Sequence, residues 1–444
     1  MSMRLKIGKQ KLLLFLYFGG IITAGSILLS FSHYSGTGSG RMYYIDALFI
    51  ATSAVCVTGL STIDMTLLSR MGQFFVVLLI QFGGLGIITF STIYLLAPRR
   101  RISIITRGLA SDYSIPSIEF RTRNIIAHII TWTAVFELLG TLVVLPVLLE
   151  HGYTLFDAVF HSISSFCNAG FSTLRSGLES FRDNAVMNIM TMILIICGGL
   201  GFIVLQDIAR NLSGKKQHLS YHSSVVLRTT AALILSGAFL IFLLESNNAF
   251  KGMGMGSKIM ASFFQSVTAR TAGFDTVPQA DFSSASQFVT IMLMFIGASP
   301  ASTGGGIKTT TFYLLMLVAL RFREGGGMLV DRNRTIMPHS IVKATAILVR
   351  AALIVLVTTT VILIAESTRG NILRIETVVF ESVSAFGTVG LSIGITPHLS
   401  TISKLALIAA MFMGRVGLFA MALPVSALSP EKYAKSPEAD ILLG

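Results

Sequence analysis

Four glycines lie in similar surroundings along this 444-residue chain, each near the end of a short segment of apolar and small polar residues. With the two residues before them they read Val57-Thr58-Gly59, Asn168-Ala169-Gly170, Thr271-Ala272-Gly273 and Thr388-Val389-Gly390. A glycine allows backbone conformations that other residues avoid, so successive carbonyl oxygens can face one axis. Rings of four carbonyls can replace the hydration shell of a cation, and Thr388-Val389-Gly390 matches the start of the TVGYG potassium filter. These residues therefore indicate cation binding by backbone oxygens.

The segments around the four glycines resemble one another over most of their length. They span residues 46–62, 157–173, 261–276 and 376–392. A phenylalanine stands ten residues before each glycine: Phe49, Phe160, Phe263 and Phe380. A large apolar residue follows each glycine: Leu60, Phe171, Phe274 and Leu391. Each segment is too short and too polar to cross a bilayer, so we predict four re-entrant half-helices that meet at one point, because irregular backbone at membrane depth must be buried or line an aqueous path.

The elements that hold these segments are predicted to be membrane-spanning helices. Apolar residues make up 53% of the chain and charged residues only 12%, whereas soluble domains are typically about 25% charged. Helices that cross a bilayer need about 20 apolar residues. Eight such windows lie at approximately 11–31, 71–97, 125–149, 184–208, 224–245, 287–319, 341–365 and 403–427, and only that at 287–319 is predicted to be interrupted.

The spans and half-helices form four copies of one unit. Gly83, Gly297 and Gly414 follow their glycines by 24 residues, and Gly198 follows Gly170 by 28. We therefore predict an all-α polytopic membrane protein of four helix–pore-loop–helix repeats around a pseudo-fourfold pore. The repeats cover residues 1–98, 115–213, 214–330 and 335–428, and residues 429–444 form a cytoplasmic tail.

The basic residues alternate between connections. The net charge is +13, and Lys and Arg concentrate in residues 4–11, 99–123, 210–228 and 321–343. Cytoplasmic loops of membrane proteins carry such an excess. The pattern therefore predicts a multi-pass protein of the cell membrane with both termini in the cytoplasm, and it disfavours nucleic-acid binding. The histidines and cysteines lack metal-ligand spacing, so no cofactor is expected in this chain.

The sixth span contains the segment 297–312, which reads GASPASTGGGIKTTTF. The run 288–320 has 33 residues, about 50 Å as continuous helix, whereas the hydrocarbon core is only about 30 Å thick. Pro300 and the glycines Gly304, Gly305 and Gly306 place the break. A phosphate-binding loop would need glycine directly before lysine, but Ile307 precedes Lys308. We predict an intramembrane gating loop beneath the four glycines, with a static kink as the alternative.

Charged residues at membrane depth are costly and usually functional. Arg415 lies in the middle of the last span and is predicted to oppose cation passage together with the gating loop, to which Lys308 adds a second positive charge. The alternative for Arg415 is a packed arginine bonded to backbone carbonyls. Arg270 is predicted to brace the third loop from behind, with Glu381 as its candidate counter-ion.

The chain resembles the Trk/Ktr/HKT superfamily of potassium transporters, and most closely the bacterial Ktr-type membrane subunit. The resemblance rests on the four repeats, on the loops VCVTGLS, FCNAGFS, RTAGFD and GTVGLS, and on the Gly-rich interruption of the third repeat. It implies that the four glycines and the two residues before each form a potassium filter. It also implies a homodimer in the lipid bilayer with a cytosolic ring of nucleotide-binding regulatory subunits, which fits the lack of a Rossmann-like domain in this sequence.

Two kinds of transport remain open. The first is channel-like potassium uptake; the second is a symporter in which sodium or protons accompany potassium, with sodium as coupling ion or activator. Interrupted helices also mark coupled transporters, but four parallel copies favour a pore. An enzyme is not expected, because no nucleotide loop, HExxH motif or Ser/His/Asp arrangement is present.

Overall fold

The computed structural model describes residues 9–36, 40–96, 122–214, 218–321, 329–332 and 334–417. Its helices are α1 (Lys9–Ser30), α2 (Tyr44–Cys56), α3 (Arg70–Leu96), α4 (Thr122–Glu150), α5 (Leu155–Cys167), α6 (Ala185–Leu200), α7 (Phe202–Leu212), α8 (Tyr221–Glu245), α9 (Met255–Thr268), α10 (Ser284–Phe295), α11 (Thr309–Arg321), α12 (Pro338–Ser367), α13 (Ile375–Gly387) and α14 (Thr401–Phe412). A two-stranded antiparallel hairpin, β1 (Val330–Asp331) and β2 (Arg334–Thr335), precedes α12. The prediction of a helical protein is confirmed. The predicted tail 429–444 lies outside the described residues.

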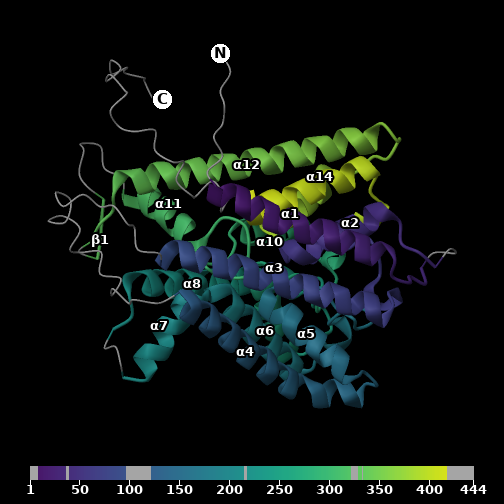
Figure 1. Cartoon of the computed structure of the whole chain (residues 1–444), viewed down its shortest axis with the longest axis horizontal. Coiled ribbons are helices and arrows are strands. Elements are labelled where there is room, and N and C mark those ends of the chain that lie inside the picture. The colour runs from purple at the N-terminus through teal and green to yellow at the C-terminus, as the bar shows by residue number, and fades with distance from the viewer. Residues whose placement is uncertain are drawn as a thin grey trace.

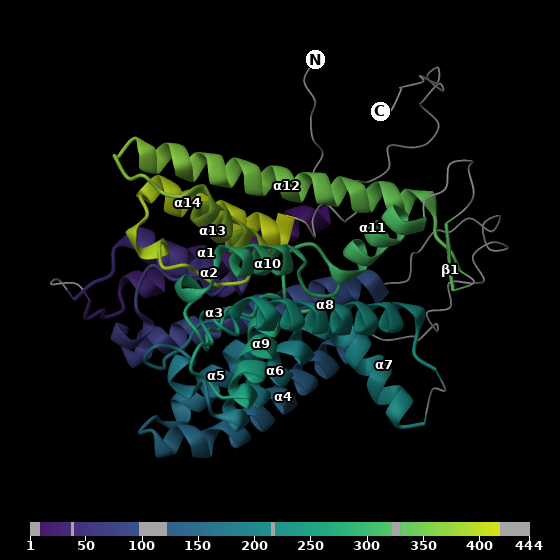
Figure 2. The same ribbon diagram turned by 180° about the vertical axis from the view of Figure 1, so that it is seen from behind.

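The helices follow one order four times. A long apolar helix comes first (α1, α4, α8 or α12), then a short helix of 13 or 14 residues (α2, α5, α9 or α13), then another helix (α3, α6, α10 or α14). The short helices are the segments predicted to be re-entrant. In Figure 1, α12 and α4 lie along opposite edges of the molecule, and α3 crosses between them. Figure 2 shows α9 and α10 from behind, between those edges.

Within the described residues, five helices are long and apolar enough to cross a membrane: α1, α3, α4, α8 and α12. They match five of the eight predicted windows. The window 287–319 is interrupted as predicted, since α10 ends at Phe295 and α11 begins at Thr309. The window 403–427 is described only as far as Gly417.

The window 184–208 was expected to be a single span, and this is wrong. It forms α6 and α7, which are bent by 104° at one residue, Gly201. Counting the bent pair as one span gives six in the described residues. Gly201 has a φ of +84°, and a Cβ there would lie 2.7 Å from the Pro300 carbonyl oxygen. The bend is therefore made by contact with the segment that interrupts the sixth span, which lies about a hundred residues later in the chain.

Small polar residues cap the starts of four helices. Asn184, Ser220, Ser283 and Ser400 each accept a hydrogen bond from the backbone N–H three residues later, at the starts of α6, α8, α10 and α14. Such caps satisfy one of the free N–H groups at a helix N-terminus.

The last helices pack against the first. The Lys404 ammonium on α14 lies 2.7 Å from the Asp46 carboxylate on α2, and both side chains are 11% exposed. α14 also shares one hydrophobic core with α1, α2 and α3. The arrangement is visible in Figure 1, where α14, α1 and α2 lie together beside α12. The chain thus closes on itself.

The hairpin is attached to the rest of the fold through Asp331. Its carboxylate accepts hydrogen bonds from Tyr221 Oη on α8 at 2.8 Å and from Tyr313 Oη on α11 at 2.7 Å. Burial raises the pKa of Asp331, but the two tyrosine hydrogen bonds and the charges of Arg332 and Arg321 outweigh it, so its pKa lies below the ordinary value. The hairpin therefore ties the helix after the interruption to α8.

Candidate functional site

The short helices end in a shared backbone conformation. Val57, Asn168 and Thr388 cap α2, α5 and α13 in the left-handed region, with φ of +56°, +60° and +50°. The next N–H donates back to the carbonyl of Ser53, Ser164 or Ser384, at 2.7 to 2.8 Å. Left-handed backbone is unfavourable for non-glycine residues and persists only where the surroundings enforce it. Three loops are therefore held in one uncommon geometry.

The third loop reaches the same geometry by a different route. α9 ends earlier, at Thr268, and Thr271 takes the left-handed conformation with a φ of +74°. The buried phenylalanine is Phe264, at 0% exposure, nine residues before Gly273. The predicted equivalence of Phe263 with Phe49, Phe160 and Phe380 is therefore wrong by one residue. In the third segment the buried phenylalanine is nine residues before the glycine rather than ten, so α9 is shifted by one residue along the chain relative to the other short helices.

The four glycines form a closed ring of contacts. A Cβ on Gly59 would lie 2.6 Å from the Ala169 oxygen and one on Gly170 would lie 2.8 Å from the Ala272 oxygen. A Cβ on Gly273 would lie 2.4 Å from the Val389 oxygen, and one on Gly390 would lie 2.3 Å from the Thr58 oxygen. Each glycine also has a positive φ, between +68° and +97°. The second residue and the glycine of every loop, eight of the twelve predicted residues, therefore lie together.

Hydroxyl groups brace the loops from the helix side. Ser53 Oγ and Ser384 Oγ each accept a hydrogen bond from the backbone N–H of the glycine in their own loop, at 3.1 Å. Ser164 Oγ donates to the Phe171 carbonyl at 2.7 Å, and Thr268 Oγ1 donates to the Phe274 carbonyl at 2.7 Å. These contacts fix the loop backbone without using side chains as part of the ring.

The interrupted segment lies directly against the ring. Between α10 and α11, Ile296 pairs with Ile307 in an isolated parallel bridge. A Cβ on Gly304 would lie 2.2 Å from Thr271 Oγ1, and one on Gly305 would lie 2.3 Å from Thr388 Oγ1. Gly306 has a φ of +64°. Only glycine allows the segment to approach two residues of the ring so closely.

The same segment is bonded to the end of α6, which the sequence analysis missed. Ser299 donates to the Gly199 carbonyl through its N–H at 3.1 Å and through its hydroxyl at 2.8 Å. Thr303 N–H donates to the Gly198 carbonyl at 3.2 Å. The N–H of Phe202, the first residue of α7, donates to the Ala301 carbonyl at 3.0 Å. The bonds to Gly198 and Gly199 satisfy carbonyls that the end of α6 leaves free, and the third satisfies a free N–H at the start of α7. The only sequence signal for them was Cys197-Gly198-Gly199-Leu200-Gly201.

Arg415 lies beside this segment. It belongs to a π-helical turn, Met413–Gly417, that continues α14, and it is 3% exposed. Its guanidinium donates to the Thr303 carbonyl and, at 3.4 Å, to the Gly83 carbonyl on α3. Lys308 Nζ donates to the Gly304 carbonyl at 2.5 Å. Both cations predicted to oppose ion passage therefore contact the interrupted segment.

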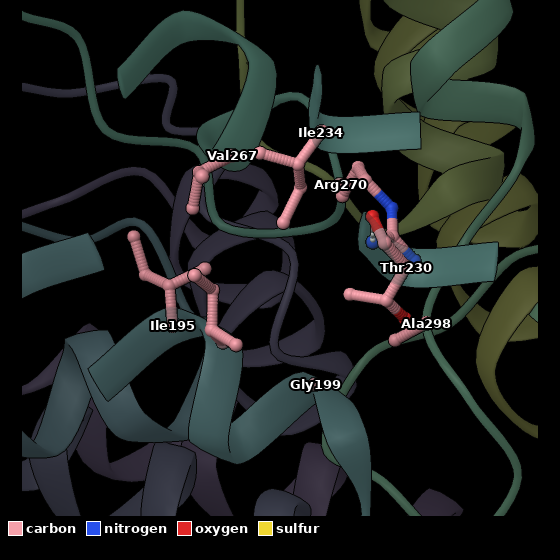
Figure 3. A pocket seen from close by; sticks show the side chains of 8 residues that line it. Ile195, Gly199, Thr230, Ile234, Val267, Arg270 and Ala298 are labelled. Carbon is pink, nitrogen blue, oxygen red and sulfur yellow. Dashed lines mark hydrogen bonds between the residues drawn. The ribbon is translucent and has the colours of Figure 1, made fainter. Parts of the chain in front are cut away.

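Arg270 lies behind the third loop. It is 8% exposed and donates to the carbonyls of Thr230 at 3.5 Å and Gly297 at 3.4 Å. Figure 3 shows it beside Thr230 and Ala298 in the wall of a small pocket that Ile195 also lines. This position agrees with a bracing role.

Glu381 does not act as the counter-ion of Arg270. Its carboxylate accepts hydrogen bonds from Thr396 Oγ1 at 2.9 Å, from the Ile393 N–H at 3.2 Å and from the Ser392 hydroxyl. Among the ion pairs of the described ranges there is none between these two residues. Glu381 instead holds the segment that follows Gly390 against α13.

No group of three or more His, Cys, Asp or Glu side chains in the described part of the chain is placed to hold a metal ion. The atoms that lie against the four glycines are mainly backbone oxygens, and backbone carbonyls are known ligands of monovalent cations.

Comparison with known proteins gives a consistent family. The family model TrkH, described as cation transport protein, matches residues 13–436. The potassium/sodium uptake protein NtpJ of Enterococcus hirae is 35% identical over 431 residues, which cover 96% of this chain and 95% of that protein. The Ktr system potassium uptake protein B of Vibrio alginolyticus is 33% identical, over 98% of this chain and 95% of that protein. The Ktr system potassium uptake protein D of Bacillus subtilis is 33% identical, over the full length of both.

A solved structure has the same fold. The crystal structure of the potassium transporter TrkH from Vibrio parahaemolyticus matches with a TM-score of 0.75 over 95% of this chain and 86% of that one. The two sequences are 20% identical, so this likeness is one of fold.

Proposed function

Because this chain belongs to the TrkH family of cation transport proteins, we propose that it takes up potassium through a pore whose selectivity filter is the ring of four glycine loops. The relatives are named as ion uptake proteins, so the chain is a membrane transporter and not an enzyme. The single observation that carries the filter is the closed series of contacts from Gly59 to Gly170, Gly273, Gly390 and back to Gly59.

The loop geometry supports cation binding. In each loop the first and third residues have positive φ and the second does not, as in Val57-Thr58-Gly59. This alternation lets successive carbonyls of one loop face the same side, where they can replace the water around a cation. The C-terminal ends of α2, α5, α9 and α13 also meet at the ring, and these helix ends carry partial negative charge that favours a cation. Potassium is the transported ion in this proposal.

The interrupted segment is proposed to be the gate. It packs against Thr271 and Thr388, at the end of the filter where the short helices finish. With the termini in the cytoplasm, this is the cytoplasmic end. Arg415 and Lys308 add positive charge at that place. A cation leaving the filter would meet a closed backbone and two like charges; movement of the segment opens the backbone and breaks the contact of Arg415 with the Thr303 carbonyl.

The proposed setting follows the family. The chain forms a homodimer in the cell membrane, with both termini in the cytoplasm, and a cytosolic ring of nucleotide-binding subunits controls the gate. The name "Ktr system" of two relatives supports a second component. No part of the proposal involves nucleic acid.

A second candidate is potassium transport coupled to sodium or protons. It is favoured by one observation, the name potassium/sodium uptake protein of the relative from Enterococcus hirae. In that case sodium is the coupling ion or an activator.

Growth and uptake of cells that lack potassium uptake systems test the proposal. Cells expressing the chain with a Ktr-type regulatory subunit should grow at low potassium and take up rubidium, and those expressing a Gly273→Asp variant should not. Uptake that is unchanged without sodium, at clamped external pH, supports the channel-like form, while uptake that requires sodium supports the coupled form. Absence of rescue at normal membrane expression would refute potassium uptake.

A further inference from the structure

Glu137 is a carboxyl group inside a span and takes no part in the ring or the gate. It lies near the middle of α4, whose adjacent residues Leu138 and Leu139 are 60% and 49% exposed. Ionisable residues at membrane depth are costly and usually have a function. Glu137 itself is only half-buried, so it lies at the border between α4 and the helices packed on it.

Its partner is an amide on α3. Gln81 Nε2 donates to a carboxylate oxygen of Glu137 at 3.0 Å. The other end of the same amide, Gln81 Oε1, accepts from Cys167 Sγ at 3.4 Å. Gln81 therefore uses both ends of its amide, and Cys167 Sγ also lies 4.0 Å from the other carboxylate oxygen of Glu137, so a small hydrogen-bond network joins α4, α3 and α5.

This hydrogen-bond network ends at the proposed filter. Cys167 is the last residue of α5 and directly precedes Asn168, which is held in the left-handed conformation. α3 approaches closely here, since a Cβ on Gly84 would lie 2.9 Å from Cys167 Sγ. Cys167 is buried at 1% exposure. Its thiol is therefore bonded as well as packed.

We propose that Glu137 is a positioning residue for the filter, acting through Gln81 and Cys167 to fix the orientation of the second loop, Asn168–Gly170. The inference rests on the proposed potassium filter and extends it to a carboxyl outside the ring. A left-handed residue needs its neighbours to hold it. Without the carboxyl, the Gln81 amide loses its acceptor and turns, the Cys167 thiol is released, and the loop carbonyls no longer match one ion size. Discrimination between potassium and sodium then falls.

The test measures the KM for potassium and for sodium separately in membrane-expressed protein with its regulatory partner. Glu137→Leu and Gln81→Leu should each lower the ratio of the KM for sodium to the KM for potassium. The expected decrease is on the order of tenfold, because each variant loses a buried hydrogen bond. The double variant should be no worse than either single one, since residues of one network are not additive. Glu137→Gln keeps an acceptor oxygen and should retain most of the discrimination.

The matched control is Glu150→Leu, the same substitution at the exposed end of α4, which should leave the ratio unchanged. If the leucine variants do not reach the membrane, Cys167→Ser and Cys167→Ala replace them. Serine keeps a hydrogen-bond donor to Gln81 and should keep the ratio of the KM for sodium to the KM for potassium. Alanine has no donor and should lower that ratio.

Additive losses in the double variant, or an unchanged ratio in the leucine or Cys167→Ala variants, would overturn the positioning role. Those outcomes leave potassium uptake by the unmodified chain intact. Failure of that chain to take up potassium would instead refute the proposed function itself.

Discussion

At the scale of single residues, the site depends on backbone contacts more than on side-chain chemistry. Arg415 illustrates this, because its bonded partners are the carbonyls of Thr303 and Gly83, and its Nε has no partner among the described residues. These contacts agree in part with the alternative interpretation of Arg415 as a packed arginine bonded to backbone carbonyls. One of those carbonyls belongs to the proposed gate, so the packing contact and the electrostatic role coincide.

Replacing Arg415 by alanine should raise potassium flux. A unit charge roughly 8 Å from an ion costs about 2 kcal/mol at an effective dielectric constant of ~20, so ion passage should become faster by about thirtyfold. Rubidium uptake per amount of membrane protein measures it. Arg350→Ala, at an exposed arginine on α12, is the control and should match the unmodified chain. Flux in Arg415→Ala at or below the unmodified level would argue against an obstacle at this residue.

A filter glycine should not tolerate serine. Gly59→Ser places a side chain at a φ of +97° and a Cβ 2.6 Å from the Ala169 oxygen, so the ring must shift and its fit to potassium weakens. We expect a lower ratio of potassium to sodium uptake, measured by isotope competition. Gly20→Ser on α1, where nothing lies within 4 Å, provides the comparison. Equal selectivity in both variants would remove Gly59 from the filter.

At the scale of elements, the sequence predicted what local patterns determine. Apolar runs indicated the long helices, and Pro300 with three glycines indicated the break in the sixth span. The bend at Gly201 could not be predicted, because it is made by a segment about a hundred residues away that supplies the partners of the α6 end. The offset of α9 was missed for a related reason: Phe263 matched the spacing, and only packing distinguishes it from Phe264.

The hydrogen bonds between the gate and α6 should hold the gate closed. Ser299→Ala removes one hydroxyl that bonds the Gly199 carbonyl at 2.8 Å, which is worth about 1 kcal/mol. Basal rubidium flux without the regulatory subunit should rise several-fold, and deletion of residues 300–308 should raise it further. Ser213→Ala at the end of α7, whose hydroxyl bonds the Ala209 carbonyl at 2.8 Å, is the control. A deletion variant that reaches the membrane and conducts no better would show that the segment is no gate.

At the scale of the whole molecule, the fold closes by contacts between its first and last parts. Asp46 and Lys404 are 358 residues apart and form a largely buried ion pair. Contacts of this sequence separation form late, because the chain between them must be ordered first. The ring of four loops is complete only when the loop after α13 reaches the loop after α2, where Gly390 lies against Thr58.

Removing one member of that pair should destabilise the closed molecule. Lys404→Met leaves the Asp46 carboxylate buried without its cation, at a cost of about 3 kcal/mol. The double variant Asp46→Asn/Lys404→Met should recover part of this loss. Thermal unfolding in detergent measures both. Arg374→Met breaks an exposed pair with Glu376, whose side chains are 83% and 55% exposed, and should change little. A Lys404→Met variant as stable as Arg374→Met would contradict a closing role.

The single interrupted segment has a kinetic consequence. All four loops of the ring belong to one chain, and within the described residues the interrupted segment between α10 and α11 packs against two of them, at Thr271 and Thr388. A pore of four identical subunits would carry four gates, and its open fraction would vary with the fourth power of the opening probability of each. In the proposed function one gate serves the ring, so the open fraction of each pore should vary with the first power of its opening probability. Opening is then a single all-or-none event without partly open levels.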